Sequence, residues 1–402
     1  MTDPSTTPDG PRARHGAPRA WVRPLRARDP HEPHRVVTPL ELLFDLCFAV
    51  AVAQAAARLH HGLGEGHVGP ALLGFGVVFF AVWWAWMGFT WFASAYDDDD
   101  VAYRVAVFVE IAGALVLAAG IPRAFDETDF RVVTLGYAIL RAGLVTLWIR
   151  AARADGPGRA TAQRYATGLV AVQLGWIALL AAPRAGWVYG WLLLAPLELL
   201  VPVWAERRGA TPWHPHHIAE RFGCMALIVL GESVLSATMA IQSALDVEGL
   251  SIPLLETILG GLLIVFGMWW AYFERPAHAL LISSRRAFVW GYGHLLIFAS
   301  TAAVGAGLAL QVDADAGPRP PHGAHDLGGW VVGVPVAVYL LALCALQVRP
   351  LDGGRRLTVA HGLAAAAALA LSPLPGATLW IGFDLVGLAV ASARACCDKG
   401  RA

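Results

Sequence analysis

Apolar stretches of about 20 residues recur along the whole chain and constrain its fold more than any other feature. The chain is 57% apolar and only 15% charged, and its mean hydropathy is +0.55. This pattern excludes a soluble enzyme and predicts an all-α membrane protein, because a helix of about 20 apolar residues crosses a bilayer. Twelve spans are expected, at 39–59, 70–95, 101–121, 131–150, 163–182, 187–205, 216–244, 252–274, 286–310, 328–348, 356–372 and 376–394.

Basic residues are distributed unevenly between the segments that connect these spans. If the N-terminus is inside, the inner segments hold most of the Arg and Lys residues. The outer segments then hold only Arg58, Arg123, Arg131, Arg184 and Arg319. Cytoplasmic loops of membrane proteins carry such an excess of Lys and Arg. We therefore expect a multi-pass protein with both termini in the cytoplasm.

A weak internal repeat is visible in the positions of two aromatic motifs. The second span contains Trp83-Trp84-Ala85-Trp86 and the eighth contains Trp269-Trp270-Ala271-Tyr272. An even number of spans in each half makes such a repeat parallel, so we expect two parallel six-helix repeats in which spans 1 and 7 face one another. The expected domains are a disordered basic cytoplasmic tail at 1–36, a first repeat at 37–208, a second repeat at 209–395 and a cytoplasmic tail at 396–402.

The segment 217–236 places charged groups on one stripe of an apolar helix. At 100° per residue, Arg221 and Glu232 lie about 20° apart around the helix, and His217 lies about 40° from Arg221. In the first span, Glu41 and Asp45 lie one turn apart on one face. Charges at membrane depth are costly and usually face a protein interior or a wet cavity. We therefore expect Arg221 to pair with Asp45 or Glu41.

These two clusters predict one polar network or transport path between spans 1 and 7. Its candidate residues are Glu41, Asp45, His217, Glu220, Arg221, Glu232 and Ser233. Structural alternatives stay open for each of them. Acidic residues near a helix start are favoured by the helix dipole, and Glu232 could be a protonated or Arg-paired side chain that ties helices together.

Further polar residues lie singly within the predicted spans. Glu110 and Arg141 fall near the middle of spans 3 and 4, which should be antiparallel neighbours, so they predict an intramembrane ion pair. Glu198 lies between Pro196 and Pro202, and broken helices often border transport sites. The remaining intramembrane candidates are His294, His361 and Asp384, with His361 and Asp384 as a candidate helix pair.

Histidine-rich segments of the chain match no recognised metal site. Neither Trp213–His217 nor the group His60, His61 and His67 has a zinc-ligand spacing. Motifs for nucleotide binding, zinc proteolysis and Ser-His-Asp catalysis are absent from the sequence. The net charge of zero gives no indication of a nucleic-acid partner. We expect no metal, no cofactor and no nucleic acid.

Three motifs together resemble the low temperature requirement protein A family of bacterial membrane proteins. They are Glu41–Gln54, the Trp-Trp-Ala-Trp motif at 83–86, and His217–Ser233, with Ile121–Phe125 as a further landmark. The resemblance covers about 38–395. It implies a polytopic protein of the bacterial cytoplasmic membrane, linked by name to growth in the cold, without a defined activity.

A more distant likeness is to small potassium channels built from two six-helix repeats. Their first helix carries a Phe-Ser-Asp motif followed by apolar residues, and Phe44-Asp45 looks like a variant without the serine.

Three functions remain open from the sequence. The first is a transporter or channel for a small ion or solute, with its path between spans 1 and 7. The second is a membrane-embedded enzyme that acts on a lipid or apolar substrate through an intramembrane carboxylate. The third is a non-catalytic scaffold, which predicts that the buried acids are closed into ion pairs. Either one chain or a homo-oligomer could form a pathway in the lipid bilayer.

Overall fold

The computed structural model describes residues 21–33, 35–316, 327–351 and 355–399. Across these ranges the regular structure is helical, without strands, and twelve long helices account for most of it. They are α1 (Pro39–Gly64), α2 (Val68–Tyr96), α3 (Val101–Asp126), α4 (Arg131–Ala154), α5 (Arg159–Leu179), α6 (Arg184–Ala205), α7 (Pro215–Glu248), α8 (Ile252–Phe273), α9 (Ser284–Asp315), α11 (Trp330–Leu343), α13 (Arg355–Leu371) and α14 (Ala377–Lys399). A π-helical turn (Cys344–Val348) and the short α12 (Arg349–Leu351) continue α11.

Ten of the twelve long helices described are long and apolar enough to cross a membrane, with α11 counted together with its continuation. The other two are α5 and α13, which correspond to the fifth and eleventh of the predicted spans. Helix α5 begins with the polar residues Arg159, Gln163 and Arg164. Helix α13 has only 17 residues, which is at the lower limit for crossing a bilayer. The all-helical prediction is therefore confirmed, with ten rather than twelve clear candidate spans.

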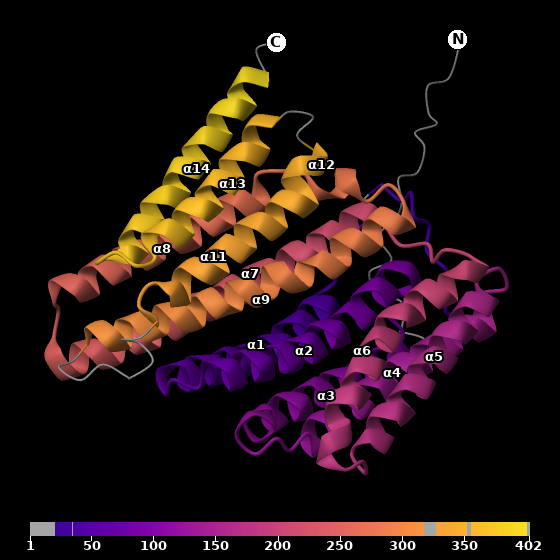
Figure 1. Ribbon diagram of the computed structural model, residues 1–402. Coiled ribbons are helices and arrows are strands. Elements are labelled where there is room, and N and C mark those ends of the chain that lie inside the picture. The colour runs from indigo at the N-terminus through magenta and orange to yellow at the C-terminus, as the bar shows by residue number, and fades with distance from the viewer. Residues whose placement is uncertain (1–20, 34, 317–326, 352–354, 400–402) are drawn as a thin grey trace, which may run out of the picture.

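The helices form two groups that meet along α1, α2, α7 and α9. In Figure 1, α1–α6 lie together in indigo to magenta, and the later helices lie together in rose, orange and yellow. Across the boundary, α1 packs against α7 and α9, and α2 also contacts both of them. Helix α9 is the most buried of the candidate spans. The boundary between the two groups is therefore the place where residues of α1 and α7 can meet.

Glycines allow the antiparallel helices α3 and α4 to approach very closely. A Cβ added to Gly113 would lie 2.4 Å from the backbone nitrogen of Leu140. A Cβ added to Gly136 would lie 2.2 Å from the backbone nitrogen of Leu117. Small residues at such contacts let membrane helices pack backbone to backbone. Larger side chains at either position would force the two helices apart.

Part of the predicted N-terminal disordered tail is bound to the acidic segment that follows α2. The backbone N–H of Arg23 donates a hydrogen bond to a carboxylate oxygen of Asp100 at 2.6 Å. The side chain of Arg28 pairs with Asp97 at 3.3 Å. Residues 21–33 therefore contact the acidic segment, and the disordered tail expected at 1–36 stays a prediction. Residues 1–20 lie outside the described chain.

Candidate functional site

The start of α1 fixes the position of the first acidic residue of the site. Thr38 is the N-cap, and its hydroxyl accepts a hydrogen bond from the backbone N–H of Glu41. In return, the backbone N–H of Thr38 donates to the Glu41 carboxylate at 2.8 Å. This capping box holds Glu41 in the first turn. Asp45 follows one turn later, and both side chains are buried.

Helix α7 brings a guanidinium between these two carboxylates. Arg221 lies 3.1 Å from the Glu41 carboxylate and donates a hydrogen bond to Asp45 at 2.5 Å. His217, one turn earlier on the same face, has its Nε2 atom 3.1 Å from Glu41. Relative exposure is 0% for Asp45, His217 and Arg221 and 1% for Glu41. The prediction that Arg221 pairs with Asp45 or Glu41 is therefore confirmed for both acids.

Helix α2 completes the network with two residues that sequence reasoning missed. The indole N–H of Trp86 donates to Asp45 at 2.7 Å, and Arg221 donates to the hydroxyl of Thr90 at 3.2 Å. Trp86 and Thr90 lie one turn apart, so they present their polar atoms on one face of α2. The one-turn spacing of Trp86 and Thr90, on the helix next to the acidic face of α1, was the sequence signal that could have identified them.

The network continues to the end of α2 through one further arginine. Arg35 lies 3.5 Å from Glu41 and 3.2 Å from Asp97. Burial raises the pKa of Asp97 to about 6, with a further contribution from the negative charge of Glu41. Asp97 therefore takes up a proton more readily than an exposed aspartate.

The network contains more acidic than basic groups. Through shared ion pairs, four carboxylates face only three guanidiniums; the acids are Glu32, Glu41, Asp45 and Asp97, and the bases are Arg28, Arg35 and Arg221. The second carboxylate oxygen of Asp45 is buried and has no hydrogen-bond partner among the described residues. An uncompensated negative charge in a dry interior is strongly unfavourable. A proton on His217 or on a carboxyl group, or a bound cation, would supply the missing positive charge.

Three predicted path residues lie outside this buried network. Glu220 is exposed and accepts a hydrogen bond from the backbone N–H of Val37 at 3.3 Å. Glu232 is partly exposed, three turns beyond Arg221, and no side chain in the described chain forms an ion pair with it. The hydroxyl of Ser233 is buried and donates to the carbonyl of Thr301 at 2.9 Å. Ser233 thus joins α7 to α9.

A second buried ion pair corrects one of the sequence predictions. Arg141 pairs with Glu198 on α6 at 2.9 Å, not with Glu110. The Glu198 carboxylate also accepts hydrogen bonds from the indole N–H groups of Trp84 at 2.8 Å and Trp176 at 3.1 Å. The predicted Glu110–Arg141 pair is wrong because α6 supplies a nearer carboxylate, surrounded by donors from α2 and α5.

Glu110 remains buried at the contact between α3 and α4. Its exposure is 0%, and neither carboxylate oxygen has a hydrogen-bond partner within the described residues. A Cβ added to Gly143 would lie 2.5 Å from the Glu110 side chain, so the carboxyl group fits against a glycine of α4. A lone buried carboxyl group is least costly when it is protonated.

The remaining polar candidates lie in the second group of helices. The His294 ring contacts the carbonyl of Trp290 at 2.7 Å and the hydroxyl of Tyr272 at 3.1 Å, so it joins α8 and α9. His361 contacts the carbonyl of Leu357 at 2.9 Å, and Asp384 is partly buried. The pairing of His361 with Asp384 stays a prediction. In the part of the chain that the structure describes, no three His, Cys, Asp or Glu side chains are grouped to hold a metal ion.

Comparison with known proteins agrees with the motifs in α1, α2 and α7. Residues 36–393 match the family described as bacterial low temperature requirement A protein. An uncharacterised protein of Rhizobium meliloti (strain 1021) is 27% identical over 279 residues, which cover 64% of this chain and 65% of that protein. No solved structure matches the chain. Because the family match includes nearly all the helices and both halves of the buried network, the chain belongs to the bacterial low temperature requirement A family.

Proposed function

We propose that this membrane protein transports a small cation or proton along a path between α1 and α7. The observation that carries the proposal is the excess of acid in the buried network of Glu41, Asp45, His217 and Arg221. Acidic residues inside a membrane are rare and commonly mark ion pathways or proton relays.

The position of the network fits a site that opens and closes. Its residues come from both groups of helices, since Glu41 and Asp45 lie on α1 and His217 and Arg221 lie on α7. All four side chains are buried in the described conformation. We propose that this conformation is closed, and that separation of α1 from α7 would expose the acids to one side of the membrane. Alternating access of this kind requires one group to move against the other.

Neighbour relations within the two groups support the proposal of two six-helix repeats. Helix α1 packs on α3 as α7 packs on α9, and α3 packs on α4 as α9 packs on α11. Helix α5 likewise packs on α6 as α13 packs on α14. The groups differ at α8, which packs extensively on α14. A parallel repeat would place the acidic start of α1 and the basic start of α7 at equivalent positions.

A scaffold is the second candidate function, and the closed ion pairs favour it. Arg221 and Arg141 both find carboxylate partners within 3.1 Å, and both are buried. Pairs of this kind can hold a helical bundle in one arrangement without any moving solute. Under this alternative, one carboxyl group of the network stays protonated and no ion is transported.

Flux measurements on purified protein in liposomes distinguish the two candidates. Potassium, sodium and proton gradients would be applied in turn, with protein-free liposomes of the same lipid composition as the control. The transport proposal expects flux of at least one of these ions above the control. Properly folded, reconstituted protein that gives no flux with any of the three would contradict transport of these cations and favour the scaffold.

A further inference from the structure

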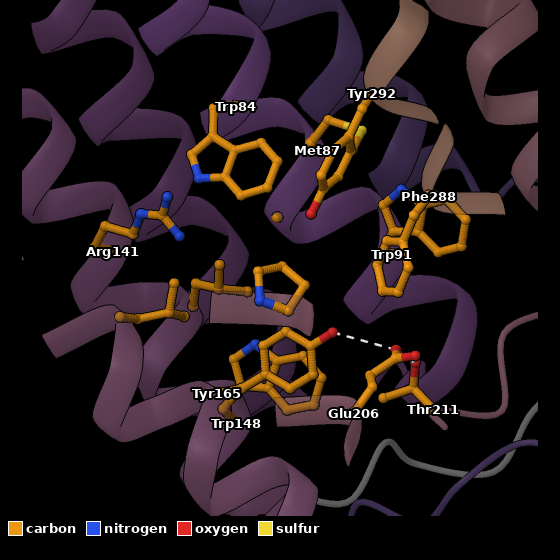
Figure 2. A pocket seen from close by; sticks show the side chains of 14 residues that line it. Trp84, Met87, Trp91, Arg141, Trp148, Tyr165, Glu206, Thr211, Phe288 and Tyr292 are labelled. Carbon is orange, nitrogen blue, oxygen red and sulfur yellow. Dashed lines mark hydrogen bonds between the residues drawn. The ribbon is translucent and has the colours of Figure 1, made fainter. Parts of the chain in front are cut away.

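A cavity lined by aromatic rings lies between α2, α4, α5, α6 and the start of α9. Its volume is about 50 Å³, room for only a few water molecules or one small organic group. Figure 2 shows Trp84, Tyr292 and Phe288 on one side of this space and Trp148 and Tyr165 on the other. The lining rings come from both groups of helices, because Phe288 and Tyr292 belong to α9. None of the network residues of α1 or α7 lines this cavity.

One carboxylate lies at the edge of the aromatic cavity. Glu206 accepts hydrogen bonds on its Oε1 atom from the hydroxyls of Thr211 at 2.8 Å and Tyr165 at 3.3 Å. Its Oε2 atom is buried and lacks a hydrogen-bond partner within the described chain. The neighbouring Arg207 and Arg208 are exposed, and neither forms a described ion pair with Glu206. The negative charge of Glu206 therefore has no cationic partner here.

The one basic group that lines the cavity is already neutralised. Arg141 borders the cavity on the side away from Glu206, as Figure 2 shows. Its guanidinium is paired with Glu198 at 2.9 Å and also donates to the hydroxyl of Tyr137 at 2.6 Å. With that pair balanced, Glu206 supplies the remaining charge. The lining as a whole is therefore aromatic and negative.

We propose that this cavity binds a small organic cation that carries an ammonium group. Aromatic faces attract a cation through the ring quadrupole, and this attraction is strongest where water is excluded. Glu206 would add a direct electrostatic contact to the same group. A neutral apolar guest would leave Glu206 without a partner. A bare metal ion would find too few oxygen ligands among rings. Ligand binding here does not depend on the transport proposed for the α1–α7 network.

Methylammonium and its neutral counterpart methanol test the charge requirement in the unmodified protein, because both are small enough for a cavity of about 50 Å³. Binding to purified full-length protein in lipid nanodiscs would be measured by calorimetry. The proposal expects saturable methylammonium binding that is about tenfold or more tighter than binding of methanol. Equal affinities, or no saturable methylammonium binding, would overturn it. This comparison needs no variant and so cannot fail through misfolding.

Two variants then assign the site within the molecule. Glu206→Gln should weaken methylammonium binding by about tenfold while leaving the weak binding of methanol unchanged. Glu232→Gln is the matched control, because it makes the same substitution at a carboxyl group that does not line the cavity, and it should retain the wild-type affinity. Methylammonium affinity that is unchanged by Glu206→Gln would overturn the assignment to this cavity.

Discussion

The start and the middle of α7 place acidic or basic groups in very different surroundings. At its start, His217 and Arg221 are fully buried, and both contact carboxylates of α1 within 3.1 Å. Three turns later, Glu232 is partly exposed, with no ion-pair partner in the described chain. Helical spacing alone puts all three on one side of α7. The difference shows that the neighbouring helices, and not the stripe itself, determine which charges become a site.

This comparison assigns different roles to the two positions. The start of α7 depends on charge balance, since removing one partner leaves another charge buried without compensation. The middle of α7 should tolerate loss of the Glu232 charge, because Glu232 is partly exposed and no ion pair depends on it. Variants of the two positions should therefore differ in both stability and transport.

The largest expected effect is that of Arg221→Met. It leaves Glu41 and Asp45 buried without their guanidinium, and breaking a buried pair in this way costs about 3–5 kcal/mol. Thermal unfolding in detergent would measure the loss. Glu232→Gln is the matched variant in the middle of α7 and should change the unfolding free energy by less than about 0.5 kcal/mol. Similar losses for both would remove the distinction between the two positions.

A smaller effect is expected for Trp86→Phe. This change retains an aromatic ring and removes the indole N–H that donates to Asp45 at 2.7 Å. A buried acceptor that loses its donor costs about 1–3 kcal/mol. Trp269→Phe is the control, because Trp269 occupies the corresponding motif of α8 and is 45% exposed. Unfolding curves that shift equally for both variants would show that the hydrogen bond to Asp45 is unimportant.

The pH dependence of stability tests the edge of the network next to Asp97. Burial and the charge of Glu41 raise the pKa of Asp97 to about 6, above its value of about 4 in the unfolded chain. The folded protein therefore binds more protons than the unfolded chain between these two values, so this residue contributes more stability as the pH falls. Relative to Asp97→Asn, wild type should gain about 1 kcal/mol between pH of about 7 and 5. A constant difference would contradict a raised pKa.

The smallest expected effect concerns the contact of α7 with α9. Ser233→Ala removes the hydroxyl that donates to the carbonyls of Val229 and Thr301. The expected loss is about 0.5–1.5 kcal/mol in unfolding free energy, without a change in ion selectivity. A change of selectivity in flux assays would place Ser233 on the path after all.

Sequence reasoning located the central network because its signals are local. Glu41 and Asp45 share a face of one helix, Arg221 and His217 share a face of another, and a buried arginine between carboxylates is the cheapest arrangement for all of them. The partner of Arg141 could not be found in this way. Both Glu110 and Glu198 were suitable acids, and only the packing of α6 against the other helices selects Glu198.

The aromatic cavity could not be predicted from the sequence for a related reason. Its rings come from four helices far apart in the sequence, and no spacing along one helix relates Trp84 to Tyr165 or Tyr292. The same limit applied to the contacts of residues 21–33. Arg28 and Arg23 meet Asp97 and Asp100, which lie about 70 residues away along the chain.

The most direct test of the central claim is ion flux through Asp45→Asn in liposomes, measured beside Glu232→Gln and wild type. Asp45→Asn leaves Arg221 paired with Glu41, so the network becomes balanced and the fold should be retained. We expect Asp45→Asn to abolish the flux seen in wild type and Glu232→Gln to retain most of it. Flux through Asp45→Asn equal to that of wild type would contradict a transport role for the excess acid between α1 and α7.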